Sequence, residues 1–217
     1  IKHRGPDDEG FWIDEKDRVA FGHRRLSILD LSAAGHQPMH SLSKRFTVVF
    51  NGEIYNHPEL RDKLESESKK KIYWKGHSDT ETLLYCFDFW GVDLTLKNIS
   101  GMFAMALYDS STKSLYLVRD RMGEKPLYYG WNSNKFIFAS ELKSIKAFEG
   151  VSTEVDREAL ALYLKYDYVP SPFSIYKGFK KLPQGAYLKL DRRDNGWVKD
   201  SEVIIEYWSM KNIANSG

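Results

Sequence analysis

Apolar residues in the chain follow two periods, one typical of strands and one typical of helices. Short runs rich in β-branched and aromatic side chains are separated by turns rich in Asp, Ser, Asn and Gly, a pattern that predicts strands. Apolar and polar residues alternate within these runs, as they do in antiparallel sheets. The runs that we interpret as strands are 10–13, 18–26, 46–50, 101–108, 114–118, 127–129, 136–139, 186–190 and 203–207.

The helical period is clearest over residues 78–90. Ser78 and Glu81 have the spacing of a capping box at the start of this segment. Four residues then share one face: Leu83, Cys86, Phe87 and Trp90. Further helices are predicted over 57–68, 141–148 and 156–166.

Strand-rich and helical segments alternate, which predicts packed layers of sheet and helix in an α+β fold and leaves the topology open. Hydrophobic residues make up 42% of the 217 residues, enough for a sizeable core. The near balance of 32 basic and 30 acidic residues argues against nucleic acid or a membrane surface as a partner. A single cysteine excludes an internal disulfide and fits a cytoplasmic protein.

Several polar residues at segment ends are candidates for chemistry. Arg25 ends a strand, where it is either a surface charge or a planar fork for a carboxylate. Asn51-Gly52 is either a hairpin turn or a pair of donors for an oxyanion, and the two interpretations have similar weight. Glu53, and Asp79 at a helix start, could hold an ammonium group. For Asp79 the alternative is simple stabilisation of the helix dipole.

Two further features are better explained by structure. Cys86 lies on the apolar face of its predicted helix, so we expect a buried core residue and not a reactive thiolate. His36 and His40 are four residues apart, but Gln37-Pro38 lies between them and argues against a helical metal site. We therefore predict no metal in this chain.

A set of motifs then gives a family resemblance. In chain order they are HRGPDDEG, RRLSILDL, FNGEIYN, HSDTETLL, GMFAMALYD, LVRDRMGEKPLYYG and FASELKSI. Together they resemble the glutaminase domain of asparagine synthetase (glutamine-hydrolysing), of the N-terminal-nucleophile class. The resemblance covers about residues 2–148 and extends more loosely to 208. It implies a four-layer αββα sandwich of two antiparallel sheets flanked by helices.

The resemblance also implies roles for single residues. Arg25 would hold the α-carboxylate of L-glutamine, with Leu26 and Ile28 along the pocket wall. The oxyanion hole would be Asn51 and Gly52. The α-amino group would be held by two carboxylates, Glu53 and Asp79.

The family's nucleophile is an N-terminal cysteine that precedes HRGPD by a few tens of residues. His3 is almost at the start here, so we expect that this cysteine and the first strand region are missing, and that these residues alone do not hydrolyse glutamine. Residues 1–208 would form the glutaminase domain, and 209–217 a linker or tail. The synthase domain of the parent, with its ATP and Mg, would lie outside the chain.

Three functions are consistent with these motifs. The first is the glutaminase domain of a longer amidotransferase that passes ammonia to ATP-activated aspartate. The second is a non-catalytic module that kept the amino-acid pocket, and the third an amidotransferase of the same architecture with another acceptor. We favour the first, because every pocket residue is present. The expected partners are L-glutamine and the synthase domain, and an exposed sheet edge could lead to a homo-oligomer.

Overall fold

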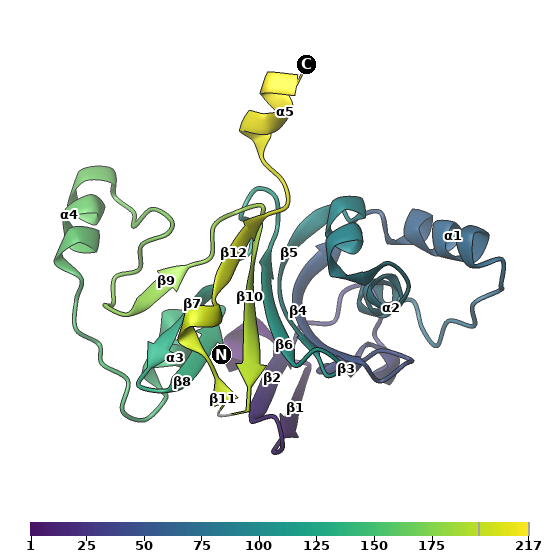
Figure 1. The fold of residues 1–217 in the computed structure, drawn as a ribbon, viewed down its shortest axis with the longest axis horizontal. Coiled ribbons are helices and arrows are strands. Elements are labelled where there is room, and N and C mark those ends of the chain that lie inside the picture. Colours follow the sequence, from purple (N-terminus) through teal and green to yellow (C-terminus); the bar gives the residue numbers. More distant parts are fainter. Residues whose placement is uncertain (195, 217) are drawn as a thin grey trace.

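The computed structural model describes residues 1–194 and 196–216. Its centre is an antiparallel sheet in the order β11-β10-β6-β5-β4-β3, with β12 also beside β10 (Figure 1). The longest pairing joins β4 to β5 over nine residues of each strand, from Phe46 opposite Asp109 to Ile54 opposite Gly101. The strands of this main sheet are β3 (Met39–His40), β4 (Phe46–Ile54), β5 (Gly101–Asp109), β6 (Ser114–Arg119), β10 (Ala186–Arg193), β11 (Gly196–Trp197) and β12 (Val203–Glu206).

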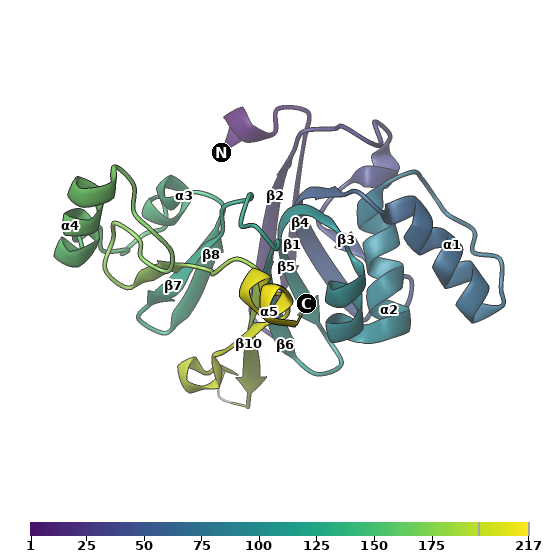
Figure 2. The same ribbon diagram turned by 90° about the horizontal axis from the view of Figure 1, so that it is seen from above.

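Two long helices cover one face of the main sheet. They are α1 (His57–Ser68) and α2 (Asp79–Asn98), which lie together on one side of the sheet in Figure 2. The core between them and the sheet includes Leu64, Phe87 and Phe103, all essentially inaccessible to solvent. The apolar face predicted for α2, formed by Leu83, Cys86, Phe87 and Trp90, packs into this core. The single cysteine, Cys86, is fully buried there.

The opposite face is covered by two separate small sheets. One is the hairpin β1 (Asp8–Asp14) and β2 (Val19–Arg25), and the other has the order β8-β7-β9. Its strands are β7 (Tyr128–Asn132), β8 (Lys135–Ala139) and β9 (Phe179–Lys181). A second core forms beneath them and includes Phe21, Tyr108 and Tyr129. Within the described residues no strand pairing joins β2 to β8, so this layer is split.

The remaining helices lie outside the sheets. Helix α3 (Leu142–Lys146) follows and contacts β8, α4 (Arg157–Tyr166) projects from the same side of the molecule, and α5 (Met210–Ser216) lies near the carboxyl end (Figure 1). Short 3-10 helices are η1 (Lys2–Arg4), η2 (Ala33–Gly35) and η3 (Lys199–Ser201). The layers confirm the predicted α+β sandwich. No helix that the structure describes is both long and apolar enough to cross a membrane.

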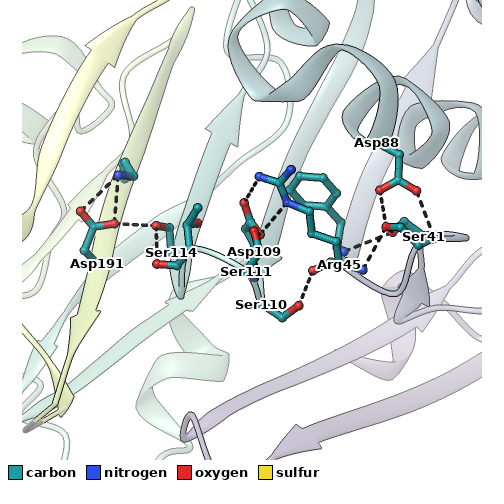
Figure 3. Close-up of polar contacts among 12 residues, drawn as sticks. Ser41, Arg45, Asp88, Asp109, Ser110, Ser111, Ser114 and Asp191 are labelled. Atoms are coloured by element: carbon teal, nitrogen blue, oxygen red, sulfur yellow. Dashed lines mark hydrogen bonds and ion pairs between the residues drawn. The ribbon is translucent and has the colours of Figure 1, made fainter.

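A row of polar contacts links neighbouring strands at one end of the main sheet, where these strands begin or finish (Figure 3). Arg45 donates two hydrogen bonds to the Asp109 carboxylate, at 2.9 and 2.6 Å. Burial alone would raise the pKa of Asp109, but the hydrogen bonds from Arg45 and Ser111 outweigh it and lower the pKa to about 2. Ser114 donates to Asp191 at 2.6 Å further along the row. Hydrogen bonds to carboxylates, one of them the buried Asp109, therefore fix this end of the strands.

Two local predictions need correction. Asn51-Gly52 is not a turn, because both residues lie inside β4, opposite Ala104 and Phe103 of β5. Helix α2 extends to Asn98, but its backbone is non-helical at Gly91 (φ 74°), so its first helical segment ends at Trp90, as predicted, and a second segment follows. At its start the Ser78 hydroxyl accepts the Thr80 N–H, as predicted for a cap.

The Glu81 side chain does not complete a capping box. Its carboxylate accepts the backbone N–H groups of Lys75 and Gly76, at 2.8 and 3.1 Å. It therefore fixes the loop that leads into α2, upstream of the cap itself.

Candidate active site

A cavity of about 580 Å³ opens between the two halves of the split layer and reaches the inner face of the main sheet. Strand β2 lines one side through residues 22–25, and the end of β8 lines the other through Phe138 and Ala139. Val49, Ala104 and Ala106 of the main sheet form its floor. The seven residues that the sequence assigned to a glutamine pocket all line this one cavity: Arg25, Leu26, Ile28, Asn51, Gly52, Glu53 and Asp79.

Arg25 stands at the end of β2 and is half-buried. Its guanidinium donates to the backbone carbonyl of Ser32 at 2.9 Å and to that of Asp30. A side chain at Gly35 would collide with it, since an added Cβ would lie 1.9 Å from Arg25 Nη2. Two of the five N–H donors are thus used to fix the fork, and the others are left for a ligand.

Asn51 and Gly52 lie side by side in the part of β4 that reaches the cavity. The Asn51 side-chain nitrogen Nδ2 is buried and has no hydrogen-bond partner among the described residues. Gly52 comes so close to β5 that an added Cβ would lie 2.1 Å from the Met102 carbonyl oxygen. A buried amide donor without an acceptor is costly unless another group supplies one, so Asn51 marks a place for an oxygen atom.

Two carboxylates stand at the same end of the cavity. Asp79 is the first residue of α2 and is buried, and its Oδ2 accepts the Ile54 N–H at 2.9 Å. Burial raises the pKa of Asp79, and the nearby charge of Glu53 acts in the same direction. Glu53, next to Gly52 in β4, is half-buried. A buried carboxylate whose pKa is raised by burial and by a neighbouring negative charge favours binding of a cation between the two groups.

Leu26 and Ile28 follow Arg25 in a loop at the cavity rim. Their side chains are 56% and 64% exposed. The loop is nevertheless anchored, because the Asp30 carboxylate accepts the Ser32 hydroxyl at 2.6 Å and the His77 N–H at 2.9 Å. These hydrogen bonds, that of Ser32 first, lower the pKa of Asp30 to about 2.

Cys86 has no part in this cavity. It is fully buried between α2 and the main sheet, and burial raises the pKa of its thiol to about 12. The prediction of a structural cysteine is confirmed. The described residues also include no group of three or more His, Cys, Asp or Glu side chains that could hold a metal ion.

Three residues at the cavity were not singled out from the sequence. Asp30 anchors the rim loop, as described above. His23 in β2 has a pKa lowered to about 4, chiefly by burial and then by the charge of Arg25, so its imidazole is neutral at pH 7. Gln37 is buried, and its amide bonds to the backbone of Phe50. Asp30 and Gln37 act on backbone groups distant in sequence, which no local pattern reveals.

Comparisons of the sequence with known proteins match a glutamine amidotransferase domain and proteins named asparagine synthetase. The family model for the glutamine amidotransferase domain matches residues 1–208. A putative asparagine synthetase [glutamine-hydrolyzing] 2 of Methanocaldococcus jannaschii is 39% identical over 214 residues, which cover 89% of this chain and 40% of that protein. Asparagine synthetase [glutamine-hydrolyzing] 1 of Bacillus subtilis is 39% identical over 186 residues, covering 86% of this chain and 28% of the relative.

The fold has solved counterparts as well. A glutamine phosphoribosylpyrophosphate amidotransferase from B. subtilis superposes with a TM-score of 0.58 at 18% identity, over 88% of this chain and 35% of that one. At this identity the likeness shows the fold alone. The chain spans 40% or less of the length of each of these three proteins.

Proposed function

Because the chain belongs to the family of glutamine amidotransferase domains, we propose that its cavity binds L-glutamine and prepares the side-chain amide for hydrolysis to glutamate and ammonia. The observation that carries the proposal is the unpaired Asn51 Nδ2, buried in a cavity that also presents Arg25, Glu53 and Asp79. A donor fork, two carboxylates and a free amide donor complement the carboxylate, the ammonium and the amide oxygen of glutamine.

Each end of the substrate has its own partners in this proposal. Arg25 binds the α-carboxylate with the N–H donors that the loop carbonyls leave free. Glu53 and Asp79 hold the α-ammonium group, and the charge of the ligand offsets the cost of placing the buried Asp79 carboxylate beside the half-buried Glu53. Leu26 and Ile28 form the wall along the aliphatic part of the substrate.

The amide oxygen lies between Asn51 Nδ2 and the Gly52 N–H. During attack on the amide carbon this oxygen gains negative charge, and fixed donors stabilise it more than they stabilise the ground state. Gly52 lets the strand approach β5 closely, since an added Cβ would lie 2.1 Å from the Met102 carbonyl oxygen.

Cys86 does not supply the nucleophile, because its thiol is buried in the other core and protonated at neutral pH. We assign the attack to a cysteine outside these 217 residues, carried on an extended segment that enters the cavity between β2 and β8. Both strands line the cavity. Such a segment would join the two halves of the split layer through backbone hydrogen bonds.

The fate of the ammonia is a further part of the proposal. The two relatives with 39% identity are named asparagine synthetases. We therefore propose that a synthase domain of a longer protein receives the ammonia and transfers it to aspartate activated with ATP and Mg. ATP and Mg are assigned to that domain in this proposal; the residues that the structure describes include no group of three or more His, Cys, Asp or Glu side chains that could hold a metal ion.

Calorimetry with L-glutamine on this chain tests the binding step. We expect saturable binding to the wild type and a loss of affinity of at least about tenfold in both Arg25→Ala and Asn51→Ala, since hydrogen bonds to charged or buried groups are lost. Arg193→Ala is the matched control, because Arg193 is exposed at the end of β10. Absence of binding, or equal affinity in Arg25→Ala and the wild type, would overturn the proposal.

A further inference from the structure

Gln37 uses both ends of its side-chain amide on the backbone of one residue. Its Nε2 donates to the Phe50 carbonyl at 3.2 Å, and its Oε1 accepts the Phe50 N–H at 2.6 Å. This two-way bond has the pattern of a partner residue in an antiparallel strand. Gln37 is 6% exposed and lines the cavity, but its polar atoms are engaged and therefore not offered to a ligand.

The bond lies where the neighbouring strand stops. Strand β3 pairs with β4 only at Val48 and Thr47. Two residues after Val48, the side chain of Gln37 takes over at Phe50, and the residue after Phe50 is Asn51. On its other edge Phe50 is opposite Met105 of β5. The chain is thus fixed from both edges immediately before the two proposed oxyanion donors.

The segment that carries Gln37 is itself fixed to the proposed carboxylate clamp. Gly35, two residues earlier, packs against the Arg25 guanidinium, and an added Cβ would meet Nη2 at 1.9 Å. His36 bonds to the Asp8 carboxylate at 2.7 Å. Strand β1 crosses Gln37 closely, since a Cβ on Gly10 would lie 2.1 Å from the Gln37 carbonyl oxygen.

We propose that Gln37 is a positioning residue that sets the oxyanion donors Asn51 and Gly52 at the correct distance from the Arg25 clamp. This inference rests on the proposed function. It predicts a larger effect on the amide end of the substrate than on its α-carboxylate and α-ammonium end. Arg25 is held by the carbonyls of Ser32 and Asp30, and Asp79 by the start of α2, whereas Asn51 directly follows Phe50.

Two ligands distinguish effects on the amide end of the substrate from effects on its α-carboxylate and α-ammonium end. L-Norvaline carries the same α-groups as L-glutamine but has no side-chain amide, so the ratio of the two affinities reports the oxyanion donors. We would measure both dissociation constants by calorimetry for the wild type, Gln37→Met, Gln37→Glu, Asn51→Ala and the control Gln184→Met. Gln184 is the other glutamine of the chain and is exposed.

We expect the preference for L-glutamine to fall about tenfold in Gln37→Met, as in Asn51→Ala, with the affinity for L-norvaline within about twofold of the wild type. Gln37→Glu keeps the acceptor for the Phe50 N–H and loses the donor, so its preference should lie between these values. If Gln37→Met fails to give a native circular dichroism spectrum, Gln37→Glu decides the result by the same ratio.

Two outcomes would overturn the inference. One is an equal loss of affinity for both ligands in the Gln37 variants, which is the effect of general structural damage. The other is an unchanged ratio in these variants while Asn51→Ala lowers it. If the wild type shows no preference for L-glutamine over L-norvaline, the proposed function fails first, and the inference falls with it.

Discussion

The two faces of the main sheet are covered in different ways. On one face, α1 and α2 form a continuous layer, and the core beneath them holds fully buried side chains such as Leu83, Phe87 and Phe103. On the other face, two small sheets leave a cavity of about 580 Å³ between β2 and β8. The same strands, β4 and β5, contribute to both cores.

Because the two faces differ, alternate side chains of β4 have different roles: some pack in the helix-covered core, and others line the cavity. In β4, Phe50 belongs to the closed core, and the next residue, Asn51, lines the open cavity. Successive side chains of a strand point to opposite faces, so a rigid helix-covered face can hold a polar site on the other. Stability should therefore come mainly from the closed face, and binding from the open one.

The largest expected effect breaks the closed face. Phe87→Ala removes a fully buried ring that packs against Phe46, with ring centroids 5.8 Å apart. We expect a loss of about 3–5 kcal/mol in the free energy of unfolding, from lost burial and the cavity left behind. The matched change on the open face, Phe138→Ala, removes a half-buried ring at the cavity wall and should cost about 1 kcal/mol.

Urea unfolding followed by circular dichroism measures both variants. The dependence of the free energy on urea should stay the same, because neither change alters the surface exposed on unfolding much. Similar losses in the two variants would contradict the proposed difference between the faces.

A smaller effect concerns the anchor of the β1–β2 hairpin. Asp17, buried in the hairpin turn, accepts the Tyr108 hydroxyl of the main sheet at 2.6 Å. Tyr108→Phe should lower stability by about 1.5–3 kcal/mol, because a hydrogen bond to a buried carboxylate is lost. Hydrogen exchange should show faster opening of β1 and β2 than of α1 and α2. Equal acceleration in both regions would mean that the hairpin does not open on its own.

The same bond gives a pH dependence. The hydrogen bond from Tyr108 is the main cause of the lowered pKa of Asp17, and it acts against burial, which raises it. A lowered pKa in the folded state contributes stability above the ordinary value of about 3.9, and that contribution is lost as the pH falls through the folded value. As the pH is lowered through about 4, the free energy of unfolding should therefore fall less in Tyr108→Phe than in the wild type.

Local rules were sufficient for most elements of both faces. The α1 helix has the predicted bounds, and α2 begins at the predicted Ser78 cap. The strand runs from β1 to β10 were placed to within a few residues, apart from the very short β3 and β9. Both strands have almost no period of their own. Strand β3 is defined by its pairing with the neighbouring β4, and β9 by its pairing with β7, which is far away in the chain.

The site shows the same limit. The seven residues identified from the motifs all line one cavity, and their roles there stay predictions. The hairpin alternative for Asn51-Gly52 failed because pairing with β5 runs through both residues and outweighs the local turn preference. In the sequence, Gln37 stands out only as a residue between His36 and His40. Its bond to Phe50 spans thirteen residues and follows from the tertiary fold alone.

The smallest expected effect tests a helix that covers neither face. The period of α4 predicts a buried side formed by Leu160, Tyr163 and Leu164, yet the Leu164 side chain is 75% exposed. Leu164→Lys should change the free energy of unfolding by less than about 0.5 kcal/mol, whereas Ala159→Lys, at the fully buried position of the same helix, should cost well over 1 kcal/mol. Sedimentation at several concentrations would accompany the urea titrations. A large loss in Leu164→Lys that grows with protein concentration would show that a second copy covers this side of α4, and that its apolar period does find a partner.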